Sequence, residues 1–521
     1  MSSNGHIESS SVPLLETPPD SDPCTDKTGD SSAEACQLLR SAMPSYDTMM
    51  DVLRRQGTWW NSYRQKVQVI SSTSRIEPLL DFATRVYTTN NPSELATLAV
   101  AYARSIGGAH DILERVESTI ISKTAYVATI TGLECLIILG KTYTDFGQPR
   151  RAWLVWKRGM AIAQLMGLHL HNRQLPQSHQ QIWWCIYHGE RFMSLLLGLP
   201  SGFNDNLYEL ELAASLPGLA ANEGWMHYFV LGCAIEAGRI VERNLLPQHY
   251  HTDTRDSYER LEALQHLPPD EWWKVPTALP PRGMELDGLV NRMLVHLFFF
   301  QVQMYFHLPS MADSDGNQGG STATSKHTCK LAARELLTRY LLLRRQVEGA
   351  YVFDCKTSDF VGFTAVVILL LSQHGHSINP PSDDKLLIQN AKDIFDELAV
   401  KTGCSIAAQF NGVLDLLCAR DKYGTGKDSP AKVVIPLFGS ILWRRLPSVD
   451  ISASPRYPDS QPQLSDEVAI ATPDYSCFFQ QSSTLLSQPG SCIDEFAAYG
   501  SFWGDGIMWD LDMEWHNNDA I

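Results

Sequence analysis

The sequence lacks closely spaced cysteines. Its eleven cysteines are scattered along 521 residues, and an odd number cannot all pair within one chain. Several lie in apolar stretches of helical periodicity, where a free thiol packs as a small hydrophobic group. Zinc sites built on thiolates use short spacings such as Cys-x-x-Cys, and no such spacing occurs. We therefore expect a reducing compartment, no disulfide framework, no metal site and no other cofactor.

Long apolar runs are also missing. A helix that spans a bilayer needs about 20 apolar residues, and the stretch 360–371 is shorter. The stretch 289–308 is interrupted by Arg292, His296 and Gln301. The first residues show neither the basic start nor the apolar centre of a secretory signal. We expect buried helices in both stretches and no membrane association.

Motifs of catalysis are absent as well. Gly424-Thr-Gly-Lys427 resembles the end of a phosphate-binding loop, but Asp421 stands where the first glycine is needed. Asp428 stands where a serine or threonine would bind Mg²⁺. Neither a Gly-x-Ser-x-Gly nor a His-Glu-x-x-His motif is present. We expect no catalytic residues and a protein that is not an enzyme.

Positive charge is scarce, and the negative charge is concentrated at the two ends. The formal net charge is −16. Residues 1–40 hold seven carboxylates against two basic residues, and residues 451–521 hold eleven against one. The region between them is close to neutral. This balance disfavours general nucleic-acid binding, which depends on a basic surface.

The region 44–445 is dominated by helical periodicity and short breakers. Apolar residues recur at steps of three and four, which is the pattern of one buried helix face. Helices are predicted at 94–106, 117–143, 150–170, 179–199, 225–243, 258–266, 289–306, 329–347, 360–371, 383–402 and 405–420. We predict an all-α fold, with one large multi-helix domain over 44–445. It is flanked by disordered acidic tails at 1–43 and 446–521, whose composition is too polar to form a core.

Two neighbouring helices carry a recognisable pattern. The first has a basic pair and a tryptophan and ends in Met166-Gly-Leu-His169; the second has a tryptophan pair and ends in Ser194-Leu-Leu-Leu-Gly-Leu-Pro200. The pattern resembles the regulatory domain of fungal-specific transcription factors, although Glu190 and Leu199 replace a common aspartate and arginine of that family. The positions that carry the resemblance are Arg150, Arg151, Trp153, Gly159, Gly167, Leu168, Trp183, Trp184, Tyr187, Arg191, Gly198 and Pro200.

The resemblance implies a helical region that modulates activity and partner choice in the nucleus. In that family it usually follows a cluster of six cysteines around two zinc ions, which contacts DNA. Before residue 44 this sequence has only Cys24 and Cys36, in an acidic stretch. Direct DNA binding by these residues is therefore doubtful, and a DNA-bound partner would supply the contact. An upstream exon that carries the cluster is the other explanation.

The last thirty residues, 492–521, combine seven carboxylates with large apolar side chains and contain no Lys or Arg. Acidic residues interleaved with aromatic ones are typical of activation segments that dock on coactivators. The residues expected to dock are Phe502, Trp503, Trp509, Leu511 and Trp515. The alternative is that this segment packs back on the helical domain.

Together these features predict a nuclear transcriptional regulator, an activator or coregulator of a fungal secondary-metabolite gene cluster. Its partners would be transcription factors or coactivators, and both a homodimer and a heterodimer are open. The alternative is a helical binding module that sequesters a partner or senses a metabolite and so dampens transcription.

Overall fold

The structure is a computed structural model. It describes residues 27–68, 77–170, 175–205, 225–245, 255–312, 320–373 and 382–419, together with three strands between 431 and 471. Most of these residues are helical, which confirms the predicted all-α class. The docking residues predicted in 492–521 lie outside the described residues, as does most of the predicted tail 446–521.

The first half of the chain forms short helices that lead into two long ones. They are α1 (Lys27–Ala42), α2 (Tyr46–Gln56), α3 (Trp59–Gln68), α4 (Leu79–Tyr87), α5 (Pro92–Ser105), α6 (His110–Val116), the π-helix η1 (Glu117–Ile121), α7 (Thr124–Val127), α8 (Ile130–Asp145), α9 (Pro149–Leu165) and α10 (Gln177–Leu197).

The second half contains most of the longest helices. They are α12 (Trp225–Leu245), α13 (Arg255–His266), α14 (Asp270–Trp273), α15 (Met284–His307), the 3-10 helix η3 (Leu308–Ala312), α16 (Gly320–Leu343), α17 (Lys356–Gln373), α18 (Ser382–Thr402) and α19 (Ser405–Ala419).

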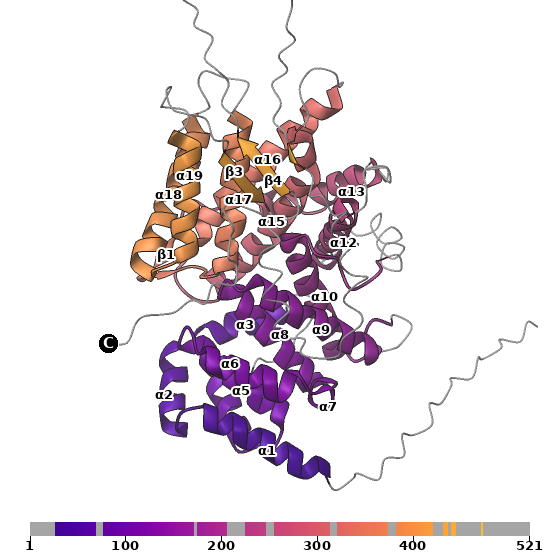
Figure 1. The fold of residues 1–521 in the computed structure, drawn as a ribbon, viewed down its shortest axis with the longest axis vertical. Helices are drawn as coiled ribbons and strands as arrows, with labels where there is room; N and C mark the ends of the chain where they lie inside the picture. The colour runs from indigo at the N-terminus through magenta and orange to yellow at the C-terminus, as the bar shows by residue number, and fades with distance from the viewer. Residues whose placement is uncertain are drawn as a thin grey trace, which may run out of the picture.

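These helices share one hydrophobic core. Its buried residues form a single cluster, whose first member in the sequence is Ala35 and whose last is Leu417. In Figure 1 the indigo and purple helices α1, α2, α5, α6 and α7 form the lower part of the molecule, and α12 to α19 form the upper part. Helices α8, α9 and α10 lie between them. Helix α9 packs on α8 and α10, α10 packs on α12, and α17 packs on α8. The predicted motif helices therefore join the two parts of the fold.

The structure corrects the predicted boundary of the N-terminal tail. Residues 1–43 were expected to be disordered, but α1 begins at Lys27 and buries Ala35, Cys36 and Leu39 against α5 and α6. The Arg40 guanidinium also donates to the Thr89 carbonyl. The polar composition of the whole segment concealed this narrow apolar stripe, because few large side chains are needed to dock one short helix.

The prediction of a single helix over 117–143 is also wrong, because the structure divides this stretch into η1, α7 and α8. The Thr129 side chain caps α8 by accepting from the Gly132 amide at 3.0 Å. A Cβ at Gly132 would lie only 2.3 Å from the Tyr126 carbonyl oxygen, so α7 and α8 meet too closely for a larger residue. Apolar periodicity alone does not reveal such a turn.

Short strands occur in two places where none was predicted: at the end of the helix predicted over 329–347, and in the region after 430. The helix predicted to reach 347 ends at Leu343, and β1 (Gln346–Val347) turns into antiparallel β2 (Ala350–Tyr351). Both turn residues, Glu348 and Gly349, have positive φ, as a tight hairpin turn requires. A second antiparallel sheet has the order β3 (Ala431–Ile435), β4 (Gly439–Trp443), β5 (Ile470–Ala471). Strand β5 falls within the region predicted as a tail.

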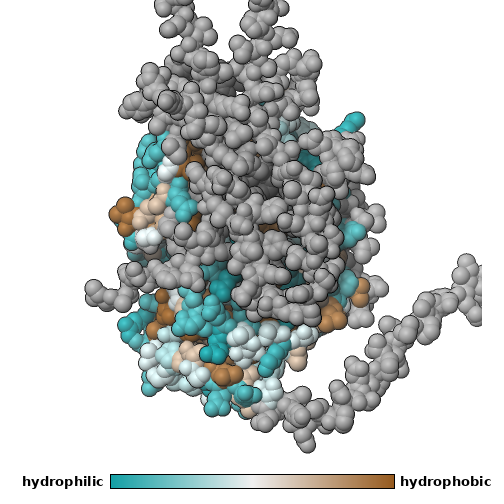
Figure 2. Space-filling model, in the orientation of Figure 1, coloured by the Kyte–Doolittle hydropathy of each residue, from teal (hydrophilic) through white to brown (hydrophobic). Residues whose placement is uncertain are grey.

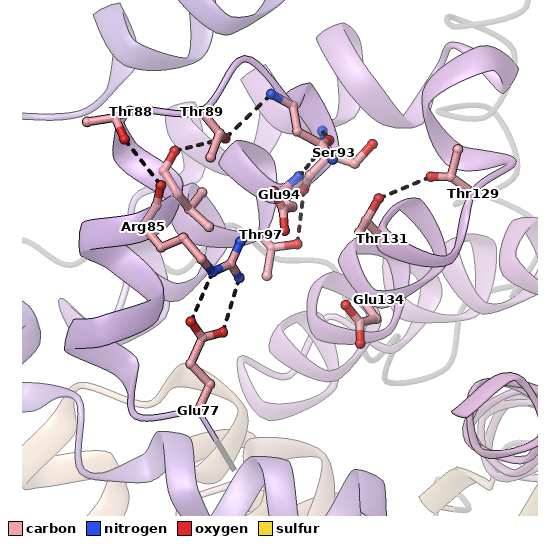
Figure 3. A network of polar contacts seen from close by, with 12 residues as sticks. Glu77, Arg85, Thr88, Thr89, Ser93, Glu94, Thr97, Thr129, Thr131 and Glu134 are labelled. Atoms are coloured by element: carbon pink, nitrogen blue, oxygen red, sulfur yellow. Dashed lines mark hydrogen bonds and ion pairs between the residues drawn. The ribbon is translucent and has the colours of Figure 1, made fainter. Parts of the chain in front are cut away.

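A surface network fixes the junction between α4 and α5 (Figure 3). Arg85 pairs with Glu77 at 3.0 Å and with Glu94 at 2.9 Å. Hydrogen bonds that Arg85 donates to these carboxylates raise the pKa of its guanidinium. Asn91 caps α5 by accepting from the amides of Ser93 and Glu94. Because Arg85 is nearly half exposed, this network orients the helices and adds little stability.

Candidate functional site

The twelve predicted motif positions all lie in one unit that consists of α9, α10 and the turn after each of them. We call residues 149–170 and 177–205 the α9–α10 unit. Trp183, Trp184 and Tyr187 are buried in it, whereas Trp153 is only partly buried. The unit packs on α8 on one side and on α12 on the other.

Trp156 is the packing centre of the unit. Its ring lies between Gly140 of α8 and Gly189 of α10, and a Cβ at either glycine would lie 2.8 Å from a ring atom. Real side chains essentially never approach that closely, so both glycines are needed for the three helices to meet. The predicted Gly159 is different, since its Cβ would lie at an ordinary 3.5 Å from Ile186.

Two glycines end the motif helices. Gly167 has φ +72° and Gly198 has φ +67°, both in the left-handed region that glycine adopts without strain. The Leu168 amide donates to the Ala163 carbonyl, and the Leu199 amide donates to the Ser194 carbonyl. This is the hydrogen-bond pattern of a Schellman cap. The Gly-Leu step after each motif helix is therefore a helix stop.

A buried ion pair joins α9 to α10. Lys157 Nζ lies 2.8 Å from Glu190 Oε1, and the Glu190 side chain is completely buried. The same oxygen accepts from Ser194 Oγ at 3.1 Å and from the Gly202 amide at 2.9 Å. Trp153 Nε1 donates to Ser194 Oγ at 3.1 Å. Glu190 therefore holds both helices and the turn after α10 at a single point.

A second buried pair anchors the same turn. Arg191 donates to Asp205 Oδ1 at 2.6 Å and to the Phe203 carbonyl at 2.8 Å, and Tyr187 donates to Asp205 Oδ1 at 2.7 Å. Burial raises the pKa of the Asp205 carboxyl, although Arg191 and the Tyr187 hydroxyl oppose the shift. A Cβ at Gly238 would lie 2.9 Å from Arg191 Nη1, so α12 also closes against this pair.

Of the remaining basic motif residues, Arg151 lies on the side of α9 that faces α6 and η1. Arg151 lies 3.3 Å from Glu114 and 3.8 Å from Glu117, and its guanidinium lies 5.2 Å from the centre of the Tyr143 ring. Arg150 is partly exposed at the start of the helix. These contacts are structural in kind: they connect helices and do not form a reactive centre.

Sequence reasoning missed Gly140 and Asp205 as members of this unit. Asp205 is in the turn after α10, and an acidic residue there, following a buried arginine, is the signal that could have indicated the pair. For Gly140, inside an apolar helix, the sequence holds no local signal.

The described residues contain no group of three or more His, Cys, Asp or Glu side chains placed to bind a metal ion. No helix in the described part of the chain is long and apolar enough to cross a membrane. A hollow between Gly147, Leu196, Lys356 and Phe360 has a volume of about 10 Å³, which is room for about one water molecule.

Comparison with known proteins finds distant relatives among fungal transcription factors. Transcription factor sdnS of Sordaria araneosa is 27% identical over 349 residues, covering 59% of this chain and 43% of the relative. The dehydrocurvularin biosynthesis regulator of Aspergillus terreus is 26% identical over 418 residues, covering 71% and 56%. Transcription factor eupR of Phoma sp is 30% identical over 208 residues, covering 37% and 43%. The chain is thus distantly homologous to regulators of this kind.

The chain spans about half the length of the curated relatives it matches. No family model matches it. No solved structure matches it either.

Proposed function

We propose that this chain is a nuclear transcriptional regulator that controls a fungal biosynthetic gene cluster for a secondary metabolite. The observation that carries the proposal is the homology itself, which covers 71% of the chain in the match to the dehydrocurvularin biosynthesis regulator. The names of the relatives describe transcription factors and a biosynthesis regulator, and none describes an enzyme.

The construction of the helical domain supports a regulatory role. Its buried ion pairs hold helices together at the α9–α10 unit, and a rigid body of this kind suits the positioning of partners. The small hollow beside α10 is far below the several hundred cubic ångströms that a small-molecule site usually needs. It therefore does not favour the metabolite-sensing alternative.

In this proposal the helical domain chooses the partner and the segment 499–515 recruits the coactivator. The 521 residues contain no cysteines spaced for a zinc cluster, so the contact with DNA comes from outside these residues. Carboxylates keep the segment hydrated, and its tryptophans supply the anchors that dominate interface energies. The docking residues are Phe502, Trp503, Trp509, Leu511 and Trp515.

A reporter assay tests the coactivator step. Residues 446–521 are fused to an unrelated DNA-binding domain, beside a version in which Trp503, Trp509 and Trp515 are changed to Ala. We expect strong activation by the intact segment and its loss in the triple variant. No activation by the intact segment would contradict the proposal.

The sign of regulation is tested in the full chain by deletion of residues 492–521. An activator loses target expression on deletion. A rise in target expression would instead identify a chain that dampens transcription by sequestering its partner.

A further inference from the structure

One face of α9 carries a stripe of basic and apolar residues, of which the apolar ones are exposed. Positions 150, 154, 158, 161 and 165 follow the three- and four-residue steps of one helix face. We call Arg150, Leu154, Arg158, Ala161 and Leu165 the α9 stripe. Leu154 is 53% exposed and Leu165 is 71% exposed, although the rest of α9 is well packed. The other exposed large hydrophobic residues of the described chain stand on several different helices, and Figure 2 shows small, separate brown patches on one face.

The charge of α9 has one sign. Over Pro149–Leu165 it contains Arg150, Arg151, Lys157 and Arg158 and no acidic residue. Glu114 and Glu117 pair with Arg151, and Glu190 pairs with Lys157.

Arg158, in the middle of the stripe, is partly buried. It donates to the Ser122 carbonyl at 3.0 Å and makes no ion pair with any described residue. The neighbouring Lys123 is exposed and lies 5.6 Å from the centre of the Tyr126 ring. The stripe therefore offers apolar contact together with the positive charge of Arg158.

We propose that the α9 stripe docks the chain's own C-terminal segment 499–515. That segment holds four carboxylates and no Lys or Arg. Its residues Trp503, Ile507, Leu511 and Trp515 recur every four positions, which places them on one face if the segment becomes helical on docking. The eleven residue steps from Leu154 to Leu165 span about 16 Å of helix, which matches the length of such a face.

A second copy of the chain is a less suitable occupant. Symmetric pairing through the stripe would bring like charges together around Arg158, which is unfavourable. An acidic segment removes that repulsion and covers the two leucines at the same time.

The segment is long enough to reach the stripe. Strand β5 ends at Ala471, so 27 residues separate it from Tyr499. Fully extended, they span about 90 Å, whereas a domain of this size has a radius of gyration of about 21 Å. A tethered segment has an effective concentration on the order of 1 mM, so even weak docking is well populated.

Docking would cover the same tryptophans that the proposed coactivator needs. The regulatory consequence, which rests on the proposed function, is that the activation segment stays covered on the α9 stripe until a partner protein competes for the segment. The docking itself does not depend on that function and is tested separately.

The test is site-specific photo-crosslinking in the full chain. A photo-reactive phenylalanine derivative replaces Ala161, in the centre of the stripe, and in a parallel protein it replaces Leu386, a 62% exposed residue of α18. Mass spectrometry maps the products, and a mixture of light and heavy isotope-labelled chains separates links within a chain from links between chains. We expect links within one chain from position 161 to residues 499–515, and none to them from position 386.

Variants then test the chemistry of the contact. Leu154→Glu with Leu165→Glu, or Trp503→Ala with Trp515→Ala, should lower the yield of this link by about tenfold, because such anchors carry most of an interface. Leu386→Glu is the matched control and should leave the yield unchanged, with the same helical circular dichroism in every variant.

Links from position 161 that go only to a second chain, or to no residue of 492–521, would overturn the proposal. Activation by the fused segment in the reporter assay would be unaffected by that result, so failure of the docking and failure of the proposed function remain distinguishable.

Discussion

Replacing Gly189 by alanine should destabilise the protein, although alanine is the better helix former. Gly189 lies inside α10, where the change to Ala contributes about 1 kcal/mol through helix propensity. Its new Cβ, however, would lie 2.8 Å from three atoms of the Trp156 ring. The ring cannot move aside, because its other face contacts α8 at Gly140, also at 2.8 Å from a Cβ there.

The two contributions can be weighed. Overpacking a well-filled core typically costs about 1–3 kcal/mol, and a contact this short to a large, fixed ring belongs near the upper end. We therefore expect a net loss of about 1–2 kcal/mol for Gly189→Ala, after subtracting the propensity gain. Gly159→Ala is the matched control on α9, since its Cβ would meet only ordinary contacts at 3.5 Å and beyond. It should gain up to about 1 kcal/mol.

Thermal and urea unfolding of the full chain measure both variants against the parent. The two variants should change the apparent Tm differently: Gly189→Ala should lower it, and Gly159→Ala should leave it equal or raise it. A double-mutant cycle with Trp156→Phe should show coupling between positions 156 and 189, because a smaller ring leaves room for the new methyl group. An unchanged or raised Tm for Gly189→Ala would refute the assignment of Trp156 as the packing centre.

Three further outcomes are expected. Glu190→Ala should cost about 3 kcal/mol, because it leaves the buried Ser194 hydroxyl, the Gly202 amide and the Lys157 ammonium without their shared acceptor, whereas removing the partly exposed Asp51 carboxylate should cost under about 1 kcal/mol; equal losses in urea unfolding would contradict the buried role. Burial, with His227 and Arg191 nearby, lowers the pKa of His188 to about 3. The unfolded chain, with an ordinary pKa near about 6.5, then takes up the proton first, so stability falls as the pH drops from about 6.5 towards about 3. His188→Gln should flatten this dependence of Tm on pH, and an identical slope would contradict it. Burial raises the pKa of the Cys135 thiol to about 12, so this thiol should react with a disulfide reagent at pH 8 only on unfolding; rapid labelling of the native protein would count against that burial.

The long helices could be predicted because their signals are local. Helix α9 begins at Pro149, a residue that suits the first turn of a helix. Gly167, with its positive φ, ends the helix just after Leu165. The same holds for α10 and Gly198. These boundaries depend on residues within the helix or directly after it, so a single sequence is enough to indicate them.

The contacts between helices could not be predicted in this way. That Gly140 faces Trp156, or that Asp205 meets Arg191, depends on how α8, α9, α10 and the following turn pack in space. The division of 117–143 depends on the close approach at Gly132, which apolar periodicity does not report. Helix α1 was missed because its few buried residues stand in a strongly polar segment.

The most direct test of the central claim is a transcript measurement in the organism that encodes this chain. The gene for this chain is deleted and then restored either intact or with Trp503, Trp509 and Trp515 changed to Ala, with Leu386→Glu as a control for altered surface residues. The account predicts that deletion lowers the transcripts of one biosynthetic gene cluster, that the intact chain and the control restore them, and that the triple variant does not. Unchanged transcripts in the deletion strain, under conditions in which the cluster is expressed, would contradict the account.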